Sequence, residues 1–383
     1  MRRAFTVAVA ALLVLAAGVA PAAAASGSAA GAAQADCSFP VTSTDATGTE
    51  VTVEERPERI TTLSPSAAQT MWELGAESQV VGVTKYATYL EGADSRTNVS
   101  GAGQSYASVE SVVSTESDLV IAPNVVPNST VEQLREAGQT VYKMEFATSV
   151  DDIYDKTELF GELTGNCEAA SETVASMRDR ISTVREAVEN SDRPRVFASQ
   201  GGGWTPGSGT FIGNMVELAG GTNVAAEANI SGYGQISEEV IVTQDPEWIV
   251  QIGQFGTYPQ TEAYNGTYAV QNDQILTVTS ENVSQPAPRV VNAVVKMAEA
   301  FHPEAYAEAN ATTTVETTTS ETTTELETTV EPTTVEPTET TTEAAMQEET
   351  TTAADDSSGG VPGFGVPAAV FALAGAALLA RRR

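Results

Sequence analysis

The sequence predicts an α/β protein in which two Rossmann-like lobes are bridged by a single long helix, with a ligand cleft between them. Two observations lead to this prediction: an amphipathic stretch in the middle of the chain, and a helix-then-strand unit that occurs once on each side of it. Short apolar runs alternate with helical patterns in both halves, which is typical of sheets covered by helices.

Residues 149–190 form the amphipathic stretch, here assigned to the linking helices. Gly165-Asn166 is expected to divide it into a short helix ending at Thr164 and a longer one from about Glu168 to Asn190. The longer helix would measure roughly 35 Å, about the diameter of a small domain. The alternative is an ordinary helix inside one domain. The apolar positions lie three and four apart: Phe160, Leu163, Cys167, Ala170, Val174, Met177, Ile181, Val184 and Val188.

The flanks of this stretch resemble each other. Ser108-Val-Glu110 leads into a strand that opens at Asp118, and Ser237-Glu-Glu239 leads into one that opens at Glu247. Serine is a good N-cap, and a glutamate in the first turn suits the positive end of the helix dipole. Each half therefore carries the same unit, which favours two lobes over one.

The first lobe is assigned to residues 36–148. Alternating valine and threonine residues around Asp45 predict a β-hairpin. The expected elements are the hairpin Val41–Val53, a strand Arg59–Ser64, a turn at Ser64-Pro65-Ser66, a helix Ala67–Leu74, a strand Gln79–Thr84, a helix Asn128–Ala137 and a strand Gln139–Glu145.

The second lobe is assigned to residues 191–310. In both lobes the strands end in loops rich in glycine and aromatic residues. Ligands of open α/β sheets bind at this carboxyl edge. The expected elements are a strand Pro194–Ser199, a helix Thr210–Ala219, a strand Gln274–Thr279 and a helix that ends at Phe301.

Residues 1–35 are predicted to be a secretory signal peptide, because two arginines precede an apolar run and an A-x-A cleavage site ends at Ala35. The pair Arg2-Arg3 also fits the core of a twin-arginine signal. An uncleaved transmembrane anchor is the alternative.

Residues 311–358 are rich in Thr, Glu and Pro, which predicts a disordered, O-glycosylated stalk. Residues 359–383 hold an apolar run barely long enough to span a bilayer, followed by arginines that would stay inside. N-x-S/T sequons are consistent with an extracellular glycoprotein. They begin at Asn98, Asn128, Asn229, Asn265, Asn282 and Asn310.

The net charge of the 383-residue chain is −32, and residues 36–310 hold 14 basic and 39 acidic residues. Such a polyanion repels nucleic acid and anionic lipid, so no nucleic-acid partner is expected. An acidic surface with few lysines also suits a protein that stays soluble in brine, which indicates a halophilic origin.

The chain has two cysteines, Cys37 and Cys167. An even pair outside the cell favours a disulfide, which would fix the mature N-terminus to the linking helices. The alternatives are two free thiols, or lipidation of Cys37.

His302 is the only histidine, so a zinc receptor or a Ser-His hydrolase lacks the imidazoles that it needs. We expect a structural role for His302 at the end of the last helix. The loop Gly201-Gly-Gly203 either cradles a phosphate, although it lacks the P-loop lysine, or lines an aromatic cleft. No metal site and no catalytic residues are predicted.

Aromatic residues gather in the predicted strand-end loops, where side chains of a hydrophobic core are not expected. Such residues bind planar, bulky, partly apolar molecules when they face a cleft. The alternative for each is packing within its own loop. They are Tyr86, Tyr89, Tyr106, Trp204, Tyr233, Phe255 and Tyr258.

An ordered set of short motifs from Val51 to Tyr306 resembles the solute-binding proteins of cobalamin and iron-siderophore ABC importers, the class III periplasmic binding proteins. The motifs are Pro57-Glu-Arg59-Ile60, Leu63-Ser64-Pro65-Ser66, Val81-Gly82-Val83, Asp118-Leu-Val-Ile, the middle helix and Pro288-Arg289. The end of the chain, from Pro362-Gly363-Phe364, is similar to the archaeal PGF-CTERM surface-anchoring signal.

The resemblance implies two lobes with little hinge closure and one acidic residue per lobe that docks on arginines of the permease. In the second lobe this position matches Glu239. In the first lobe it falls on Gln69, and Glu73, one turn further, is a substitute. Tyr86 matches a tyrosine of cobalamin-binding members, although two other aromatic positions of those members are not matched.

We therefore expect a receptor, not an enzyme, that needs no cofactor and captures a metal chelate, either cobalamin or a ferric siderophore. A receptor for haem or another metal chelate is an alternative. Its partners would be an ABC permease and its ATPase. It would be a monomer, secreted to the outer face of the membrane and held there by its C-terminal anchor. An extracellular enzyme and an adhesion module are the alternatives. The expected ligand-binding residues are Ser66, Tyr86, Tyr106, Trp204, Tyr233, Tyr258 and Arg289.

Overall fold

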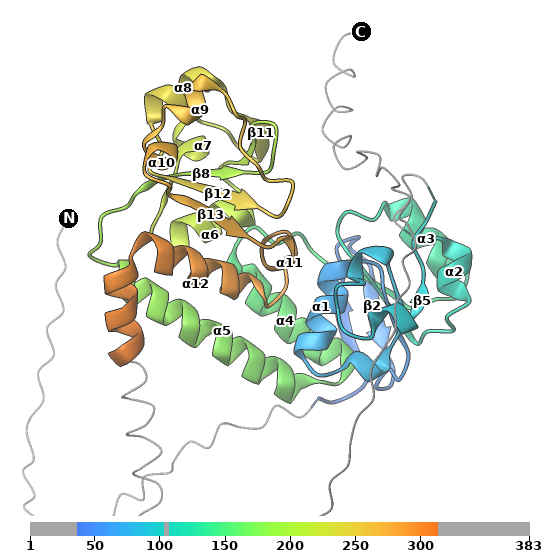
Figure 1. Ribbon diagram of the computed structural model, residues 1–383. Coiled ribbons are helices and arrows are strands. Elements are labelled where there is room, and N and C mark those ends of the chain that lie inside the picture. Colours follow the sequence, from blue (N-terminus) through green and yellow to red (C-terminus); the bar gives the residue numbers. More distant parts are fainter. Residues whose placement is uncertain (1–36, 103–106, 313–383) are drawn as a thin grey trace, which may run out of the picture. The chain divides into compact units, whose positions relative to one another are not determined.

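The computed structural model describes residues 37–102 and 107–312 (Figure 1). The predicted signal peptide, the stalk beyond residue 312 and the anchor lie outside the described residues. None of the described helices has both the length and the apolar character needed to cross a membrane.

The first lobe is built on a five-stranded parallel sheet with the strand order β5-β4-β3-β6-β7. Its central strand residues are buried on both faces, as expected for a parallel sheet between helices. The strands are β3 (Ile60–Thr62), β4 (Val80–Val83), β5 (Thr97–Asn98), β6 (Leu119–Ala122) and β7 (Val141–Lys143). The helices are α1 (Pro65–Glu73), α2 (Val109–Val113) and α3 (Asn128–Glu136), with 3₁₀ turns at Glu77–Gln79, Lys85–Ala87 and Ala93–Ser95.

The second lobe has a four-stranded parallel sheet with the order β10-β8-β12-β13. Its strands are β8 (Arg195–Ser199), β10 (Thr222–Asn223), β12 (Trp248–Ile252) and β13 (Ile275–Val278). A small antiparallel sheet pairs β9 (Trp204–Pro206) with β11 (Tyr233–Gln235). The helices are α6 (Phe211–Leu218), α7 (Val224–Glu227), α8 (Glu238–Gln244), α9 (Glu262–Asn265), α10 (Tyr268–Gln271), α11 (Ser280–Val283) and α12 (Val290–Phe301).

The two lobes repeat one plan. The order β4-β3-β6-β7 in the first sheet corresponds to β10-β8-β12-β13 in the second. Arg59 before β3 donates to the carbonyls of Thr115 and Glu116, and Arg195 at the start of β8 donates to those of Gln244 and Asp245. The predicted two-lobed α/β fold is therefore confirmed.

Two residues show how closely the repeat is kept. Glu116 and Asp245 occupy equivalent turns, and both have positive φ, 49° and 42°. Non-glycine residues rarely adopt this conformation, so chance agreement is improbable. In each lobe the carboxylate just before the next strand, Asp118 or Glu247, accepts from the backbone N–H of the arginine of that lobe, Arg59 or Arg195.

The connection between the lobes is made by two helices, α4 (Val150–Thr164) and α5 (Cys167–Val188), which pack against each other. The start of α4 and most of α5 lie in the core of the second lobe, whereas Phe160, Leu163 and Ala170 lie in the core of the first. The chain reverses at Gly165, whose φ of 73° favours glycine. The predicted break is confirmed, and α5 is the long helix.

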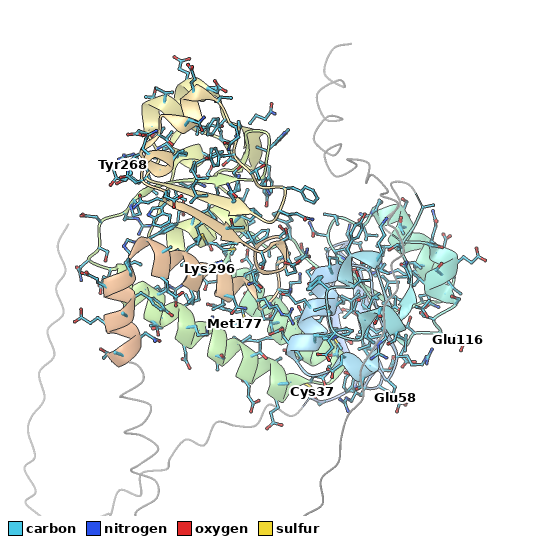
Figure 2. The ribbon with its side chains drawn as sticks, viewed as in Figure 1. Cys37, Glu58, Glu116, Met177, Tyr268 and Lys296 are labelled. Carbon is cyan, nitrogen blue, oxygen red and sulfur yellow. A yellow bond between two sulfur atoms is a disulfide. The ribbon has the colours of Figure 1, made fainter. Side chains whose placement is uncertain are left out.

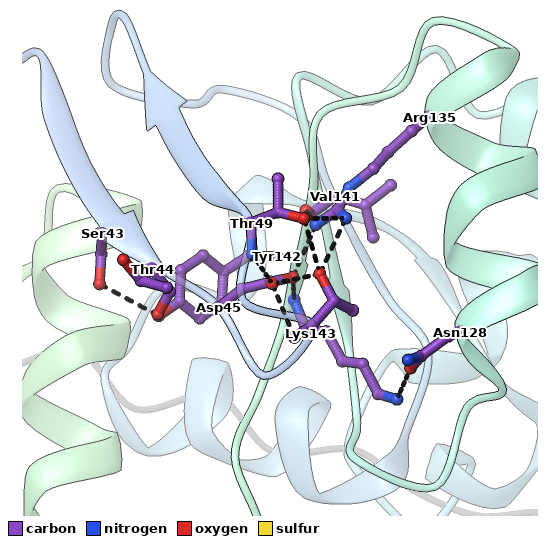
Figure 3. A network of polar contacts seen from close by, with 10 residues as sticks. Ser43, Thr44, Asp45, Thr49, Asn128, Arg135, Val141, Tyr142 and Lys143 are labelled. Carbon is purple, nitrogen blue, oxygen red and sulfur yellow. Dashed lines mark hydrogen bonds and ion pairs between the residues drawn. The ribbon is translucent and has the colours of Figure 1, made fainter.

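The N-terminal hairpin, β1 (Val41–Thr44) with β2 (Glu50–Val53), is fixed to the first lobe through its turn. The buried carboxylate of Asp45 lies 2.6 Å from the Arg135 guanidinium and also accepts from the backbone N–H of Lys143 (Figure 3). Burial alone would raise the pKa of Asp45, but these bonds and those from Thr47 hold it below its ordinary value. The hairpin is therefore structural.

The structure contains the predicted disulfide between Cys37 and Cys167 (Figure 2), which closes a loop of 130 residues. Cys167 is the first residue of α5. The bond thus joins the N-terminal segment to the linking helices at the end that lies in the first lobe.

A second set of contacts joins the lobes directly, between α1 and the segment 280–289. The Glu73 carboxylate lies 2.6 Å from Arg289 Nε, and Gln69 Nε2 donates to the Glu281 carbonyl at 2.9 Å. The Lys156 amine of α4 donates to the Pro286 carbonyl. We call Gln69, Glu73, Glu281 and Arg289 the interlobe clasp.

Replacing both cysteines by serine is expected to lower the free energy of unfolding by about 3–5 kcal/mol, because the unfolded chain regains the entropy of a long closed loop. Thermal unfolding measures the effect. The wild type under reducing conditions should match the double variant, and an unchanged midpoint would contradict the role of the bond.

Glu73→Gln and Arg289→Gln are expected to be coupled in a double-mutant cycle by about 0.5–1 kcal/mol, since each removes the same partly exposed ion pair. The control is the more exposed pair Glu158 and Arg178, within the linking helices, which should couple less. Additive effects of the two clasp substitutions would show that the lobes are not held by this pair.

Candidate functional site

One loop segment of the second lobe lies against the first lobe and the linking helices. The segment 280–289 follows β13 and contacts Gln69 of α1, the helix that follows β3. Its Pro286 carbonyl contacts Lys156, which lines a hollow together with residues 144–147, the segment that follows β7. The segment after β13 of the second lobe and the segment after β7 of the first therefore both lie beside Lys156 of α4.

The small sheet of the second lobe presents two of the predicted aromatic residues on one face. Trp204 is opposite Gln235, and Tyr233 is opposite Pro206. Opposed residues and residues two apart share a face, so Trp204 and Tyr233 are diagonal neighbours. Both rings retain exposed surface.

The glycine loop is a packing element. Gly201 has a φ of 96°, and a Cβ atom there would collide with the Phe255 carbonyl oxygen. Glycine thus allows the loop after β12 to lie against the loop after β8. Phe255 is 71% exposed beside it.

The first lobe presents apolar surface at the ends of three strands. Tyr86, after β4, is 62% exposed, and the Lys85 amine lies 5.0 Å from the centre of its ring. Val125 after β6 and Phe146 after β7 are also exposed. Sequence reasoning missed these two, although their positions directly after predicted strands gave the same signal as Tyr86.

Two predicted ligand residues, Tyr258 and Ser66, have surroundings other than a cleft. Tyr258 is buried in the second lobe's core, 6.2 Å from the ring of Tyr264. Ser66 lies inside α1 and not in a turn, because Pro65 starts the helix at a position where its missing N–H costs nothing. Its buried hydroxyl bonds to that of Ser64. Tyr106 lies outside the described residues.

The interlobe clasp contains three residues that were predicted to bind the ligand or the permease: Arg289, Glu73 and Gln69. Arg289, which was expected to bind the ligand, is paired with Glu73 across the lobes. Gln69 is fully buried, and its amide also donates to the Tyr89 hydroxyl. A residue without exposed surface cannot present itself to a permease, so the prediction of a docking role for Gln69 is wrong.

Glu239 lies in the first turn of α8, and its side chain is exposed. The equivalent residue of the first lobe is Glu110, exposed in the first turn of α2. Both helices are capped by a serine, Ser237 and Ser108. The sequence repeat already aligned Glu110 with Glu239, but Glu110 was not among the residues predicted to dock on the permease.

A hollow of about 260 Å³ lies between the segment after β7 and α4. Its lining combines apolar surface with four charged side chains, and Lys156 is the only cation. The lining residues are Met144, Glu145, Phe146, Ala147, Asp152, Asp155, Lys156 and Leu159.

No group of three or more His, Cys, Asp or Glu side chains within residues 37–102 and 107–312 is arranged to hold a metal ion. His302 is buried after α12 with its ring edge-on to Phe301. Burial lowers the pKa of His302, which keeps the ring neutral. Its surroundings are those of a packed core residue.

A family model described as periplasmic binding protein matches residues 60–282. A cobalamin-binding protein of Halobacterium salinarum is 48% identical over 357 residues, covering 90% of this chain and 89% of that protein.

Two solved structures are similar in fold, and each is 24% identical to this chain. The periplasmic vitamin B12 binding protein of Vibrio cholerae gives a TM-score of 0.56 over 64% of this chain and 97% of its own. The periplasmic haem-binding protein of Roseiflexus sp. RS-1 gives a TM-score of 0.58 over 65% of this chain and 99% of its own. With a family match over more than half of its length and this fold, the chain belongs to the periplasmic binding protein family.

Proposed function

We propose that this chain is the extracellular substrate-binding component of an ABC importer, and that it captures a corrinoid such as cobalamin and delivers it to the permease. One observation carries the proposal: exposed aromatic side chains follow strands in both lobes, and the segments after β7 and β13 both lie beside Lys156 of the linking helices. No bond is made or broken in this role, so it requires no catalytic residue.

The exposed rings fit a large, planar, partly apolar guest. Tyr86 and Phe146 belong to the first lobe, and Trp204, Tyr233 and Phe255 to the second. Aromatic faces remove apolar surface from water at a low entropic cost, because each side chain has only two rotatable angles. The 48% identical relative is named a cobalamin-binding protein, which favours a corrinoid over haem or a ferric siderophore.

The lobes are held at a nearly fixed separation. The linking helices contribute residues to both cores, and the interlobe clasp adds an ion pair and a hydrogen bond between α1 and the segment 280–289. A receptor of this kind binds with little closure, since a hinge motion would break the clasp.

We assign permease docking to Glu110 and Glu239. They occupy equivalent positions of the repeated unit, carry exposed carboxylates and would suit arginines on the permease. Glu73 does not fit this role, because its carboxylate is already paired with Arg289.

The remaining parts of the chain suit a protein tethered outside the cell. The signal peptide at residues 1–35 would export it, the stalk at 311–358 would hold the lobes away from the membrane, and the PGF-CTERM-like segment at 359–383 would anchor it. We propose that the receptor acts as a monomer, since each chain carries both lobes.

Binding of coloured chelates tests the function. Immobilised full-length protein is expected to retain cyanocobalamin in preference to haem and to ferric hydroxamate or catecholate siderophores, as judged from the absorbance of the retained fraction. If the protein retains only haem or only a siderophore, the corrinoid assignment is wrong and that chelate is the ligand. If it retains none of the chelates, the receptor proposal is wrong.

Trp204→Ala and Tyr233→Ala are each expected to weaken cyanocobalamin binding about tenfold, because each removes a stacking face worth roughly 1–2 kcal/mol. Titration of tryptophan fluorescence or of corrinoid absorbance measures the affinity. Tyr268→Ala is the matched control, an exposed tyrosine of α10 outside the site (Figure 2). Equal affinities in all three variants would contradict the aromatic site.

Glu110→Lys and Glu239→Lys are expected to abolish most uptake by cells while ligand binding stays unchanged, because a lysine would repel the arginines of the permease. Labelled corrinoid uptake is compared with binding by the purified variant. Glu132→Lys on α3 and Glu299→Lys on α12 make the same charge change on exposed glutamates elsewhere. If these two control variants impair uptake as much as Glu110→Lys and Glu239→Lys do, the change in net charge and not the loss of docking explains the effect.

A further inference from the structure

The hollow beside α4 is too small for a whole chelate. Pockets that enclose drug-sized ligands measure about 300–1,000 Å³, and a corrinoid is larger than such ligands. A volume of about 260 Å³ suits one pendant group of a guest whose ring system lies against the aromatic residues. Phe146 belongs both to those exposed rings and to the lining of the hollow, so the two sites adjoin.

Lys156 has no carboxylate partner among the described residues. Its single bond in that part of the chain is the one from Nζ to the Pro286 carbonyl at 3.1 Å. Asp152, one helical turn before it, is occupied: its Oδ2 accepts from Thr148 and from the backbone N–H of Ser149. An ammonium group has three donors, so Lys156 can donate further bonds into the hollow.

The hollow also offers acceptors. Glu145 and Asp155 are exposed at its lining, and with Asp152 they give three carboxylates against one cation. A guest anion would gain from Lys156 but would face the three carboxylates. A primary carboxamide suits this lining better, because its carbonyl oxygen accepts from an amine while its NH₂ group donates to a carboxylate.

We propose that the hollow binds one carboxamide arm of a corrinoid, with Lys156 donating to the carbonyl oxygen and Asp155 or Glu145 accepting from the NH₂ group. The proposal rests on the corrinoid receptor function above and adds its specificity determinant. Corrinoids carry several such amide arms around the ring, whereas haem carries carboxylates at its edge. In this proposal Lys156, and not the predicted Arg289, is the positively charged residue that binds the ligand.

The proposal has a pH signature. Burial lowers the pKa of Lys156 to about 8, so its ammonium is present below that pH and is lost above it. Glu145, Asp152 and Asp155 line the hollow with Lys156, and the segment that supplies the Pro286 carbonyl carries Glu281 and Arg289. Carboxyl and guanidinium groups in general do not titrate between pH 6.5 and 9.5. The affinity for cyanocobalamin is therefore expected to fall as the pH rises through about 8.

The test measures cyanocobalamin affinity for full-length wild type, Lys156→Met, Lys156→Arg and Lys296→Met. Lys296 of α12 is the matched control, an exposed lysine that also donates to a backbone carbonyl, that of Thr277 (Figure 2). At pH 7, Lys156→Met should bind tenfold or more weakly, as expected for a lost charged hydrogen bond, and Lys296→Met should bind normally. Lys156→Arg should keep most of the affinity but lose its decline above pH 8.

A second arm changes the ligand. Among the cyanocobalamin monocarboxylic acids, each with one amide hydrolysed, one isomer is expected to bind wild type at least tenfold more weakly than the parent. The double variant Glu145→Gln, Asp155→Asn should restore much of that loss, because it removes two of the repelling carboxylates.

The outcomes separate the two proposals. If wild type retains no corrinoid, both the receptor function and the amide site are overturned. If wild type binds cyanocobalamin but Lys156→Met binds it equally well, or if all monocarboxylic isomers bind like the parent, only the amide site is overturned. Thermal unfolding of each variant guards against a loss of structure, since Lys156→Met also removes the hydrogen bond to the Pro286 carbonyl.

Discussion

The structure depends on two helices that are buried in two cores at once. The apolar stripe of α4 and α5 packs into the first lobe near the turn at Gly165 and into the second lobe along the rest of its length. Neither lobe can move far from the helices without exposing part of its own core to water, which costs free energy in proportion to the apolar area. The Cys37–Cys167 disulfide strengthens the same junction. A fixed spacing between two sets of aromatic loops follows from this packing.

Charged residues near the junction are divided between holding the lobes and facing the guest. Glu73 and Arg289 neutralise each other across the lobes, and Gln69 is sealed beside them. Lys156 has no such partner among the described residues and lines a hollow whose other charged side chains are all carboxylates. Charged residues of the same types thus have different roles. A charge that is already paired contributes little to ligand binding. An unpaired ammonium group in a partly buried hollow favours a guest that can accept its hydrogen bonds.

The duplication of the lobes links the binding edge to the docking surface. Each repeat begins with a capped helix whose first turn carries an exposed glutamate, and each ends in a strand whose carboxyl end opens toward the aromatic loops. A pair of equivalent glutamates is therefore produced by the fold itself. The equivalence extends to the positive-φ residues Glu116 and Asp245 and to the arginines that cap their turns.

The sequence by itself determined the lobes, the break at Gly165, the long α5 and the strand-end positions of Tyr86, Trp204 and Tyr233, because hydrophobic periodicity, capping and turn residues act over a few neighbouring positions. Only the tertiary structure decided which polar residues are paired with each other and which remain available to a ligand or a partner. Glu73 and Arg289 are 216 residues apart, as Gln69 and Glu281 are 212, so no local pattern could reveal the clasp. Tyr258 and Phe146 both follow strands, yet one ring is buried and the other exposed, since neighbouring loops and not propensity decide which side chain is covered.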